Sequence, residues 1–392
     1  MNSINPVEKI IFKKGVFEDL ANYLTKFESV LIITSKTPKK LYLKALVGFL
    51  NEKNLQFSVC EINNNNDNEN VLNCTIKAKN FACILSFGAG KVTDIAKVVA
   101  NNLNIPLIVA PSTISHFGYF NNCAYLNNGI ATEKFTCNYP DKIFIDENII
   151  KNSPENFIFS TCCFIFSFAE TYFSSLVESK IFATDITYQL NSIKRIINKT
   201  SGLINWLNLN RDVAVLNLTD NIIELWANLQ SLQQDFPAVM MAAQNYKNNI
   251  NSCFGRHCLT FSRTLLSVYK FFWTDKNLSY KDIPNYEKLI KILQKKQKNA
   301  DFFIEFVKKF ENFTSAEFFF KIKSLKSNFS NVAILECEKM SKICKRVMTT
   351  FAKYEKRIIN EEEFFDSLSY VALTSNCFQL NSIMRLGYLN LA

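Results

Sequence analysis

The sequence predicts an α/β domain built on a doubly wound parallel sheet, followed by an all-helical domain. Through residue 150, short apolar runs alternate with segments of helical periodicity, as in Rossmann-like sheets covered by helices on both faces. After residue 150 the strand-like runs disappear and amphipathic helical segments follow one another. A length of 392 residues suits two domains, which we place at 1–150 and 151–392.

Four apolar runs are the expected strands of the first domain. Each is short and apolar throughout, as strands buried on both faces of a sheet are: SVLIIT (29–34), FACILSF (81–87), IPLIVAP (105–111) and KIFID (142–146). Helical spacing is found between and before them, over 17–26, 37–50, 70–80 and 91–103. The Asn-rich tract 62–70 predicts a solvated loop that leads into a helix.

The boundary between the domains is expected within 146–157, where Ser153-Pro154 is a pair typical of a helix start. The run that follows, 157–169, is apolar on every side but shorter than the ~20 residues that cross a bilayer. It predicts a buried central helix. Further helices are expected at 183–199, 218–235, 258–272, 300–312, 329–352 and 361–376.

Composition narrows the possible partners. A hydrophobic content of 48% excludes wholesale disorder. The 12 cysteines form no CxxC pair, which favours buried free thiols in a reducing compartment, and the chain start shows no secretory leader, so we expect a cytoplasmic protein without a membrane partner. The net charge of +10 lies mostly after residue 150, without the basic runs and interleaved aromatics of a nucleic-acid face. We therefore expect anionic small molecules as ligands, and no nucleic acid.

The segment SFGAGKVTDIAK (86–97) is the strongest local signal. It follows a predicted strand and opens a helix, whose free N–H groups suit a phosphate. The candidate cofactor-binding residues here are Gly88, Ala89, Gly90, Lys91 and Asp94. Because Thr93 stands in the place of the third glycine, the common GxGxxG fingerprint is absent, and a plain strand–helix turn is the alternative.

A second polar cluster follows the next strand, in APSTISHFGYFNN (110–122). Ser112, Thr113 and Ser115 place hydroxyl groups at the carboxyl end of a parallel strand, where open α/β sheets bind ligands. His116 is one of only two histidines in the chain and is a candidate proton donor, although a histidine in a loop is more often structural.

Together, GAGKVTDIAK, PSTISHFG and PDKIFIDENIIKNSPENF resemble the sn-glycerol-1-phosphate dehydrogenases. That family belongs to the superfamily of dehydroquinate synthases and iron-containing alcohol dehydrogenases, and the resemblance covers about residues 80–160. It implies a dehydroquinate synthase-like fold with NAD or NADP in the cleft between the domains. Residues 88–91 would hold the pyrophosphate, supported by Asp94, and the three serine and threonine hydroxyls would lie near the nicotinamide.

The resemblance also implies a divalent metal, usually zinc, held by one carboxylate and two histidines. His257 matches the first histidine, but no histidine follows it to supply the second. Counting without gaps from Ser153-Pro154, the carboxylate position falls on Phe164, and Glu170 could replace it only if the helix register slips. The aspartate expected after His116 is Phe117. A three-ligand zinc site therefore cannot be assembled from the family positions.

Arg256 and Arg263 lie seven residues apart on a predicted helix, where they could grip a substrate phosphate or form a solvated surface. Three hypotheses follow. One is a homo-oligomeric dehydrogenase that reduces a small phosphorylated ketone such as dihydroxyacetone phosphate, with His116 and His257 as catalytic groups. The second is a divergent relative that keeps the nucleotide cleft without dehydrogenase chemistry. The third, a dehydroquinate-synthase-like lyase, fits less well because the DxxxGGK run of that branch is missing.

Overall fold

The structure is a computed structural model that describes residues 9–63, 67–114, 117–127, 132–231, 254–274 and 315–350. The chain divides into two compact units, one formed by 1–161 with 205–227 and the other by 162–204 with 228–392. The helical segment 205–227 therefore returns to the first unit, which the sequence did not indicate. The functional division at residue 150 stays a prediction.

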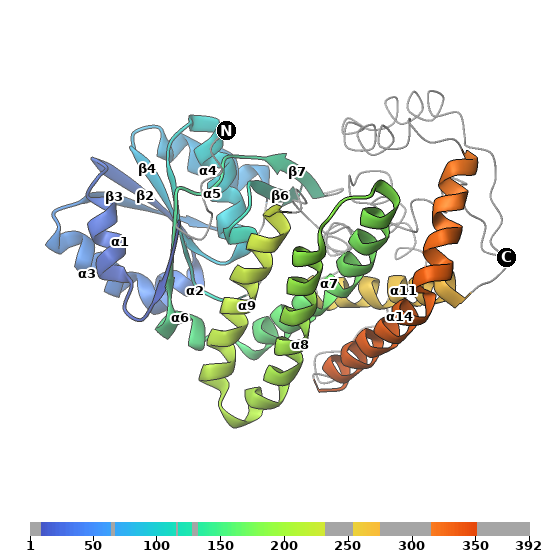
Figure 1. The fold of residues 1–392 in the computed structure, drawn as a ribbon. Helices are drawn as coiled ribbons and strands as arrows, with labels where there is room; N and C mark the ends of the chain where they lie inside the picture. Colours follow the sequence, from blue (N-terminus) through green and yellow to red (C-terminus); the bar gives the residue numbers. More distant parts are fainter. Residues whose placement is uncertain are drawn as a thin grey trace. The chain divides into compact units, whose positions relative to one another are not determined.

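The first unit is built on a six-stranded parallel sheet in the order β1-β8-β5-β4-β2-β3 (Figure 1). Its strands are β1 (Ile10–Lys13), β2 (Ser29–Ser35), β3 (Gln56–Ile62), β4 (Cys83–Gly88), β5 (Leu107–Pro111) and β8 (Lys142–Asp146). The four predicted strands, β2, β4, β5 and β8, are confirmed. The sequence missed β1 and β3, which form the two edges of the sheet.

Helices cover both faces of this sheet, so the doubly wound prediction is confirmed (Figure 1). The helices of the first unit are α1 (Phe17–Leu24), α2 (Lys36–Pro38), a π-helical turn (Lys39–Leu43), α3 (Lys44–Glu52), α4 (Asn68–Ala78) and α5 (Gly90–Leu103). One apolar cluster joins Leu20 of α1 and Leu46 of α3 to Val30 and Leu85 of the sheet. Because side chains alternate along a strand, the strand residues between these point to the other face of the sheet. That face is covered by α4 and α5, which pack together.

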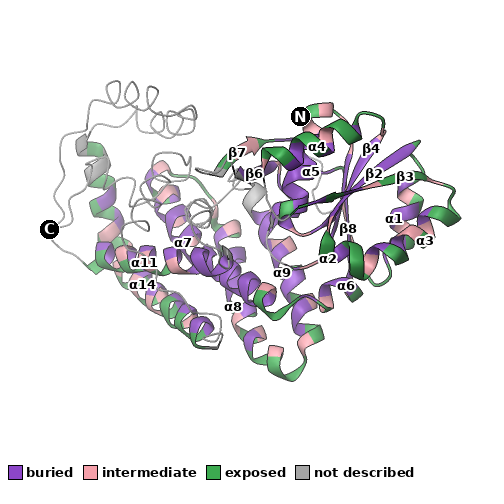
Figure 2. Cartoon of the chain, turned by 180° about the vertical axis from the view of Figure 1, so that it is seen from behind, coloured by how far each residue is buried: buried purple, intermediate pink, exposed green. Residues whose placement is uncertain are grey.

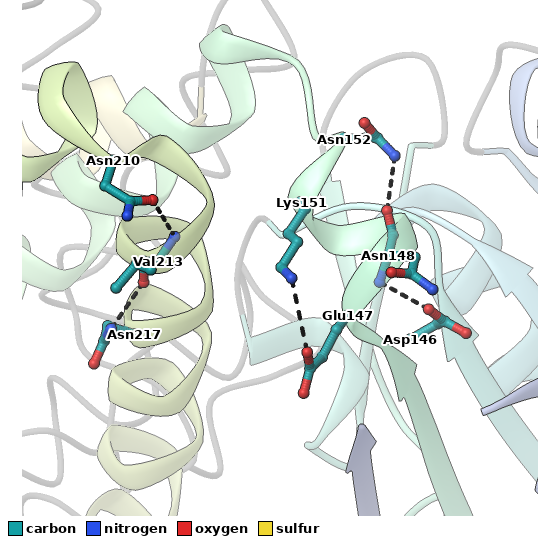
Figure 3. A network of polar contacts seen from close by, with 8 residues as sticks. All are labelled: Asp146, Glu147, Asn148, Lys151, Asn152, Asn210, Val213 and Asn217. Carbon is teal, nitrogen blue, oxygen red and sulfur yellow. Dashed lines mark hydrogen bonds and ion pairs between the residues drawn. The ribbon is translucent and has the colours of Figure 1, made fainter. Parts of the chain in front are cut away.

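A short antiparallel pair of strands follows β5, and a short helix follows β8. An antiparallel pair, β6 (Cys123–Asn127) and β7 (Thr132–Thr136), was not predicted. Beyond β8, the carboxylate of Asp146 begins the short helix α6 (Glu147–Lys151), because its Oδ1 accepts a hydrogen bond from the Asn148 N–H at 2.8 Å (Figure 3). Its Oδ2 accepts from the Val16 N–H at 2.9 Å. One buried carboxylate thus fixes the starts of both α6 and α1.

The described part of the chain after residue 150 contains helices and no strand. They are α7 (Glu155–Phe182), α8 (Thr187–Leu209), α9 (Arg211–Ser231), α11 (Phe254–Thr274) and α14 (Ser315–Thr350). The prediction of a helical second half is confirmed for these segments. The helices expected at 300–312 and 361–376 lie outside the described residues.

Helix α7 begins directly after Pro154, as predicted, and is buried along most of its length (Figure 2). Phe159, Phe164 and Phe168 are each 0% exposed. By length and apolar composition α7 could cross a membrane, but 89% of its most apolar window is buried inside the protein. That burial is typical of the core helix of a globular domain.

Candidate functional site

The turn between β4 and α5 is held at the carboxyl ends of three neighbouring strands. Thr34, at the end of β2, donates its hydroxyl hydrogen to the carbonyl of Phe87 at 2.7 Å. On the other side, the N–H of Ser112 donates to the carbonyl of Gly88 at 3.0 Å. The predicted glycine loop and the predicted hydroxyl-bearing loop therefore meet, at the edge where open α/β sheets bind their ligands.

The amino end of α5 is suited to an anion. The residue that precedes the helix is Ala89, whose methyl side chain cannot accept a hydrogen bond from the first N–H groups. Gly90 opens the helix and Lys91 follows it on the exposed surface. A phosphate here would meet backbone N–H groups, the positive end of the helix dipole and an ammonium group.

Gly88 is required by packing. A Cβ built on this residue would lie 2.5 Å from Cγ2 and 2.8 Å from Cβ of Val92, one turn into α5. Such distances exclude any side chain, so the glycine allows α5 to pack closely on the end of β4. This is the helix–strand role that one glycine of dinucleotide-binding turns often has.

Asp94 and Lys97 lie inside the fold. Lys97 is 1% exposed, and its Nζ donates to Oδ1 of Asn121 at 2.6 Å and to the carbonyl of Cys123 at 2.9 Å. Burial lowers the pKa of Lys97 to about 8, although the Asp94 carboxylate opposes this shift. At 1.5 Å per residue, Lys97 lies ~10 Å from the start of α5. It anchors the segment that leads into β6, far from any phosphate at the helix end.

The sequence contains a signal for this buried lysine. Lys97 lies in VTDIAKVVA, where residues 92–100 are otherwise apolar except Thr93 and Asp94, and all nine are buried. A lysine in the middle of such a helix needs internal acceptors, which predicts a structural anchor better than a surface charge.

The loop after β5 turns one of its predicted hydroxyls inward. Thr113 lines a small apolar cavity with Tyr119 and Phe120, and its Oγ1 has no hydrogen-bond partner among the described residues. Ser112 is 6% exposed and remains beside the glycine turn. Ser115 and His116 lie outside the described residues.

The same loop is held from behind by residues that the sequence did not indicate. The N–H of Ile114 donates to Oγ of Ser153 at 3.0 Å. Arg211, at the start of α9, donates to the carbonyls of Lys151 and Ser153. Arg211 therefore fixes the segment that positions the loop after β5. No local pattern reveals this role, because these residues are about 60 positions apart.

Within the second unit, two hydrogen bonds fix the register between α7 and α11. Ser262 donates to the carbonyl of Ser167 at 3.1 Å, and the hydroxyls of Ser174 and Tyr269 lie 2.7 Å apart. Both pairs are separated by 95 residues, so the helices run parallel, and a residue on α7 lies level with the residue 95 positions later.

This register separates the two candidate metal ligands. Glu170 lies level with Leu265, eight residues from His257, or ~12 Å along the helix axis. Phe164 instead lies level with Leu259, within one turn of His257. The register thus brings Phe164, and not Glu170, close to the height of His257 on these two helices.

Glu170 has a structural environment of its own. It is 2% exposed, and its carboxylate accepts a hydrogen bond from the Ser174 hydroxyl. Burial raises the pKa of Glu170 to about 7, and the bond from Ser174 only partly offsets this. Among the described residues, no group of three or more His, Cys, Asp and Glu side chains could hold a metal ion. The described donors therefore do not fit the metal that the resemblance implies.

The two predicted phosphate-binding arginines lie in different environments. Arg256 is 6% exposed and so lies inside the helical unit, whereas Arg263 is exposed on the surface of α11. His257 is buried beside Arg256. A shared grip on one substrate phosphate stays a prediction.

Comparison with known proteins finds a sequence likeness within the first unit. A model of the iron-containing alcohol dehydrogenases matches residues 11–154. The glycerol-1-phosphate dehydrogenase [NAD(P)+] of Methanosphaera stadtmanae is 31% identical over 146 residues, covering 36% of this chain and 42% of that protein. The enzyme of the same name from Methanococcoides burtonii is 24% identical over 158 residues, covering 39% and 44%. The matched part thus spans about two fifths of the length of these relatives.

Solved structures extend the likeness in fold. A variant of an archaeal halo-thermophilic alcohol dehydrogenase from a Red Sea brine pool superposes with a TM-score of 0.64 at 13% identity, covering 98% of this chain and 94% of that one. NADH-dependent butanol dehydrogenase A from Thermotoga maritima gives 0.60 at 13% identity, covering 96% and 98%. The α/β-plus-helical fold is therefore the one these enzymes share. Over residues 11–154 the chain is therefore similar in sequence to the iron-containing alcohol dehydrogenases, and its fold is similar to theirs.

Proposed function

We propose that the chain binds a nicotinamide dinucleotide, NAD or NADP, at the amino end of α5 and acts as a dehydrogenase. The observation that carries the proposal is the uncapped start of α5, joined to the loop after β5 by the bond from Ser112 to Gly88. The substrate we propose is a small phosphorylated ketone such as dihydroxyacetone phosphate. The matched relatives are glycerol-1-phosphate dehydrogenases, which supports this choice.

Each element of this site has a defined task. The N–H groups at the start of α5 and the ammonium of Lys91 would bind the pyrophosphate. Ser112 would contact the cofactor from the neighbouring loop, which Ser153 and Arg211 hold in place. The cofactor, when bound, supplies or accepts the hydride. We propose His116 on that loop as the group that gives a proton to the substrate oxygen.

The helical unit favours a second candidate function. Phe164 stands where the resemblance predicts a carboxylate, and Glu170 is too distant from His257 to replace it. We therefore derive no step through a metal. The alternative function is a relative that keeps the nucleotide site and has lost the metal-dependent reaction. The buried free cysteines of the described residues support a reducing, cytoplasmic location for either candidate.

Calorimetric titration of NADH and NADPH tests the shared part of both candidates. We expect one of the two to bind, and Lys91→Ala combined with Gly90→Val to abolish binding. The matched control is Lys53→Ala, an exposed lysine after α3, which should bind normally. Circular dichroism checks that each variant is folded. Normal cofactor binding by the folded double variant would contradict the assignment of the loop.

Cofactor oxidation in the presence of dihydroxyacetone phosphate separates the two candidates. The dehydrogenase predicts turnover that His116→Ala strongly reduces while cofactor affinity is unchanged. The alternative predicts cofactor binding without turnover, with or without added zinc. Elemental analysis of the same sample reports any stoichiometric metal, which would need at least one ligand outside the described residues.

A further inference from the structure

Two cysteines that are 14 positions apart in the sequence lie side by side in the first unit. Cys60 is on β3 at the edge of the sheet, and Cys74 is on α4, which covers that edge. Their Sγ atoms are 3.2 Å apart, and both residues are buried, at 2% and 1% exposure. The pair has no CxxC spacing, because one cysteine lies on a strand and the other on the helix that follows it.

The position of Cys60 on its strand explains why the thiols meet. In the parallel register between β2 and β3, Cys60 lies opposite Ile33, whose side chain is on the α4 side of the sheet rather than in the cluster under α1 and α3. Glu61, the next residue, points the other way and bonds to Lys39 at 2.8 Å. The strand's alternation thus directs the Cys60 thiol at α4.

The pair has the chemistry of an attacking and a resolving thiol. A hydrogen bond from Cys74 lowers the pKa of Cys60 to about 7, with a smaller contribution from Lys77, whereas the same bond and burial raise the pKa of Cys74. Burial instead raises the pKa of other thiols, for example to about 12 for Cys83, Cys162 and Cys344. Because the thiolate is the nucleophile, Cys60 is the reactive member of the pair.

We propose that Cys60 and Cys74 form a redox modification site, which a hydroperoxide converts to an intramolecular disulfide and a dithiol restores. In the first step the Cys60 thiolate attacks the peroxide oxygen, the O–O bond breaks, and sulfenic acid and hydroxide form. In the second step the Cys74 sulfur displaces that hydroxyl as water and loses its proton. In total, two thiols and one hydrogen peroxide give one disulfide and two waters.

The geometry fits this product better than a passive apolar contact. A disulfide bond is ~2.05 Å long, so the sulfur atoms need to approach by only about 1 Å, within the reach of side-chain rotation. The small size of hydrogen peroxide suits a pair that lies beneath the surface. Sulfenic acid formed at Cys60 would meet its resolving thiol at once, which favours the disulfide over further oxidation.

Peptide mass spectrometry of the full chain after peroxide treatment tests the proposal. We expect a cross-linked species joining the Cys60 and Cys74 peptides, lighter by two hydrogen atoms, which dithiothreitol converts back to free thiols. Cys60→Ser and Cys74→Ser should each abolish it. The matched control is Cys344→Ser, which removes a buried thiol elsewhere and should leave the cross-link unchanged.

Two further results distinguish a specific site from general oxidation. Blocking free thiols in the unfolded protein after a graded peroxide exposure should show this pair lost at least tenfold faster than Cys83 or Cys162. Cys74→Ser should instead accumulate a dimedone-reactive sulfenic acid at Cys60. Retention of both thiols under conditions that oxidise the other cysteines would overturn the proposal, as would a cross-link that persists in Cys60→Ser.

Discussion

Replacing Glu170 by glutamine should make the protein more stable above neutral pH and change little at acidic pH. Burial raises the pKa of Glu170 from 4.5 to about 7, so the folded state holds its proton where the unfolded chain has lost it. The stability that this proton gives is complete below pH 4.5 and is lost as the pH rises through 7. At ~1.4 kcal/mol per pKa unit, the full effect is roughly 3 kcal/mol, most of it between pH 5 and 8.

Urea unfolding of the wild type and Glu170→Gln at pH 5 and 8 measures this difference directly. Glutamine keeps an oxygen that accepts the hydrogen bond from Ser174 and cannot ionise, so the variant should gain roughly 2–3 kcal/mol on the wild type between the two pH values. The matched control is Glu155→Gln, an exposed carboxylate on the same helix, which should show no such gain. An equal pH dependence in wild type and Glu170→Gln would refute the reasoning. Zinc that stabilised the wild type but not the variant would show instead that Glu170 is a ligand.

Three other changes test the first unit. Gly88→Ala should cost about 1–3 kcal/mol by forcing a Cβ against Val92, and adding Val92→Ala should recover most of that loss in urea unfolding. Lys97→Met should remove the titration of a buried lysine, because burial lowers the pKa of Lys97 to about 8. The free energy of unfolding of the wild type should therefore rise by up to roughly 3 kcal/mol relative to the variant as the pH rises from 8 towards 10.5. Parallel curves of unfolding free energy against pH would contradict this. Arg211→Ala should cost about 1–3 kcal/mol by leaving two carbonyls without their donor, while Arg211→Lys loses less; an unchanged melting temperature in Arg211→Ala would refute that role.

The strands that the sequence predicted are those that are buried on both faces and therefore contain a continuous apolar run. β2, β4 and β5 lie inside the sheet with helices on both faces, so nearly every residue is buried and each strand contains an apolar run. The edge strand β3 alternates between exposed and less exposed residues and gives no such run. β1 is only four residues long, and the β6–β7 hairpin follows a polar loop. A continuous apolar run identifies a strand that is buried on both faces. A strand with an exposed face lacks such a run and is therefore not predicted from it.

The site shows the same limit. The glycine turn and the helix start that follows it were predictable, because a turn, a helix and its charges are local in sequence. Arg211, the Cys60–Cys74 pair and the acceptors of Lys97 were not, since each depends on partners brought together by the fold over 14 to 60 positions. The register between α7 and α11 was equally invisible, yet it decides whether Glu170 can meet His257.

Phe164 gives a physical reason why the helical unit lacks a carboxylate at the expected metal position, while the first unit keeps its glycine turn. Its side chain is 0% exposed and packs edge-on against Phe168, with ring centroids 5.5 Å apart. A carboxylate at that buried position would cost several kcal/mol unless a bound cation compensated its charge. With phenylalanine there, the core of the helical unit is stable without such a cation. The start of α5 has no side-chain cap on its N–H groups, which suits an anion. The proposed nucleotide site and the expected metal position therefore lie on separate residues of this chain, so a change at one leaves the other intact.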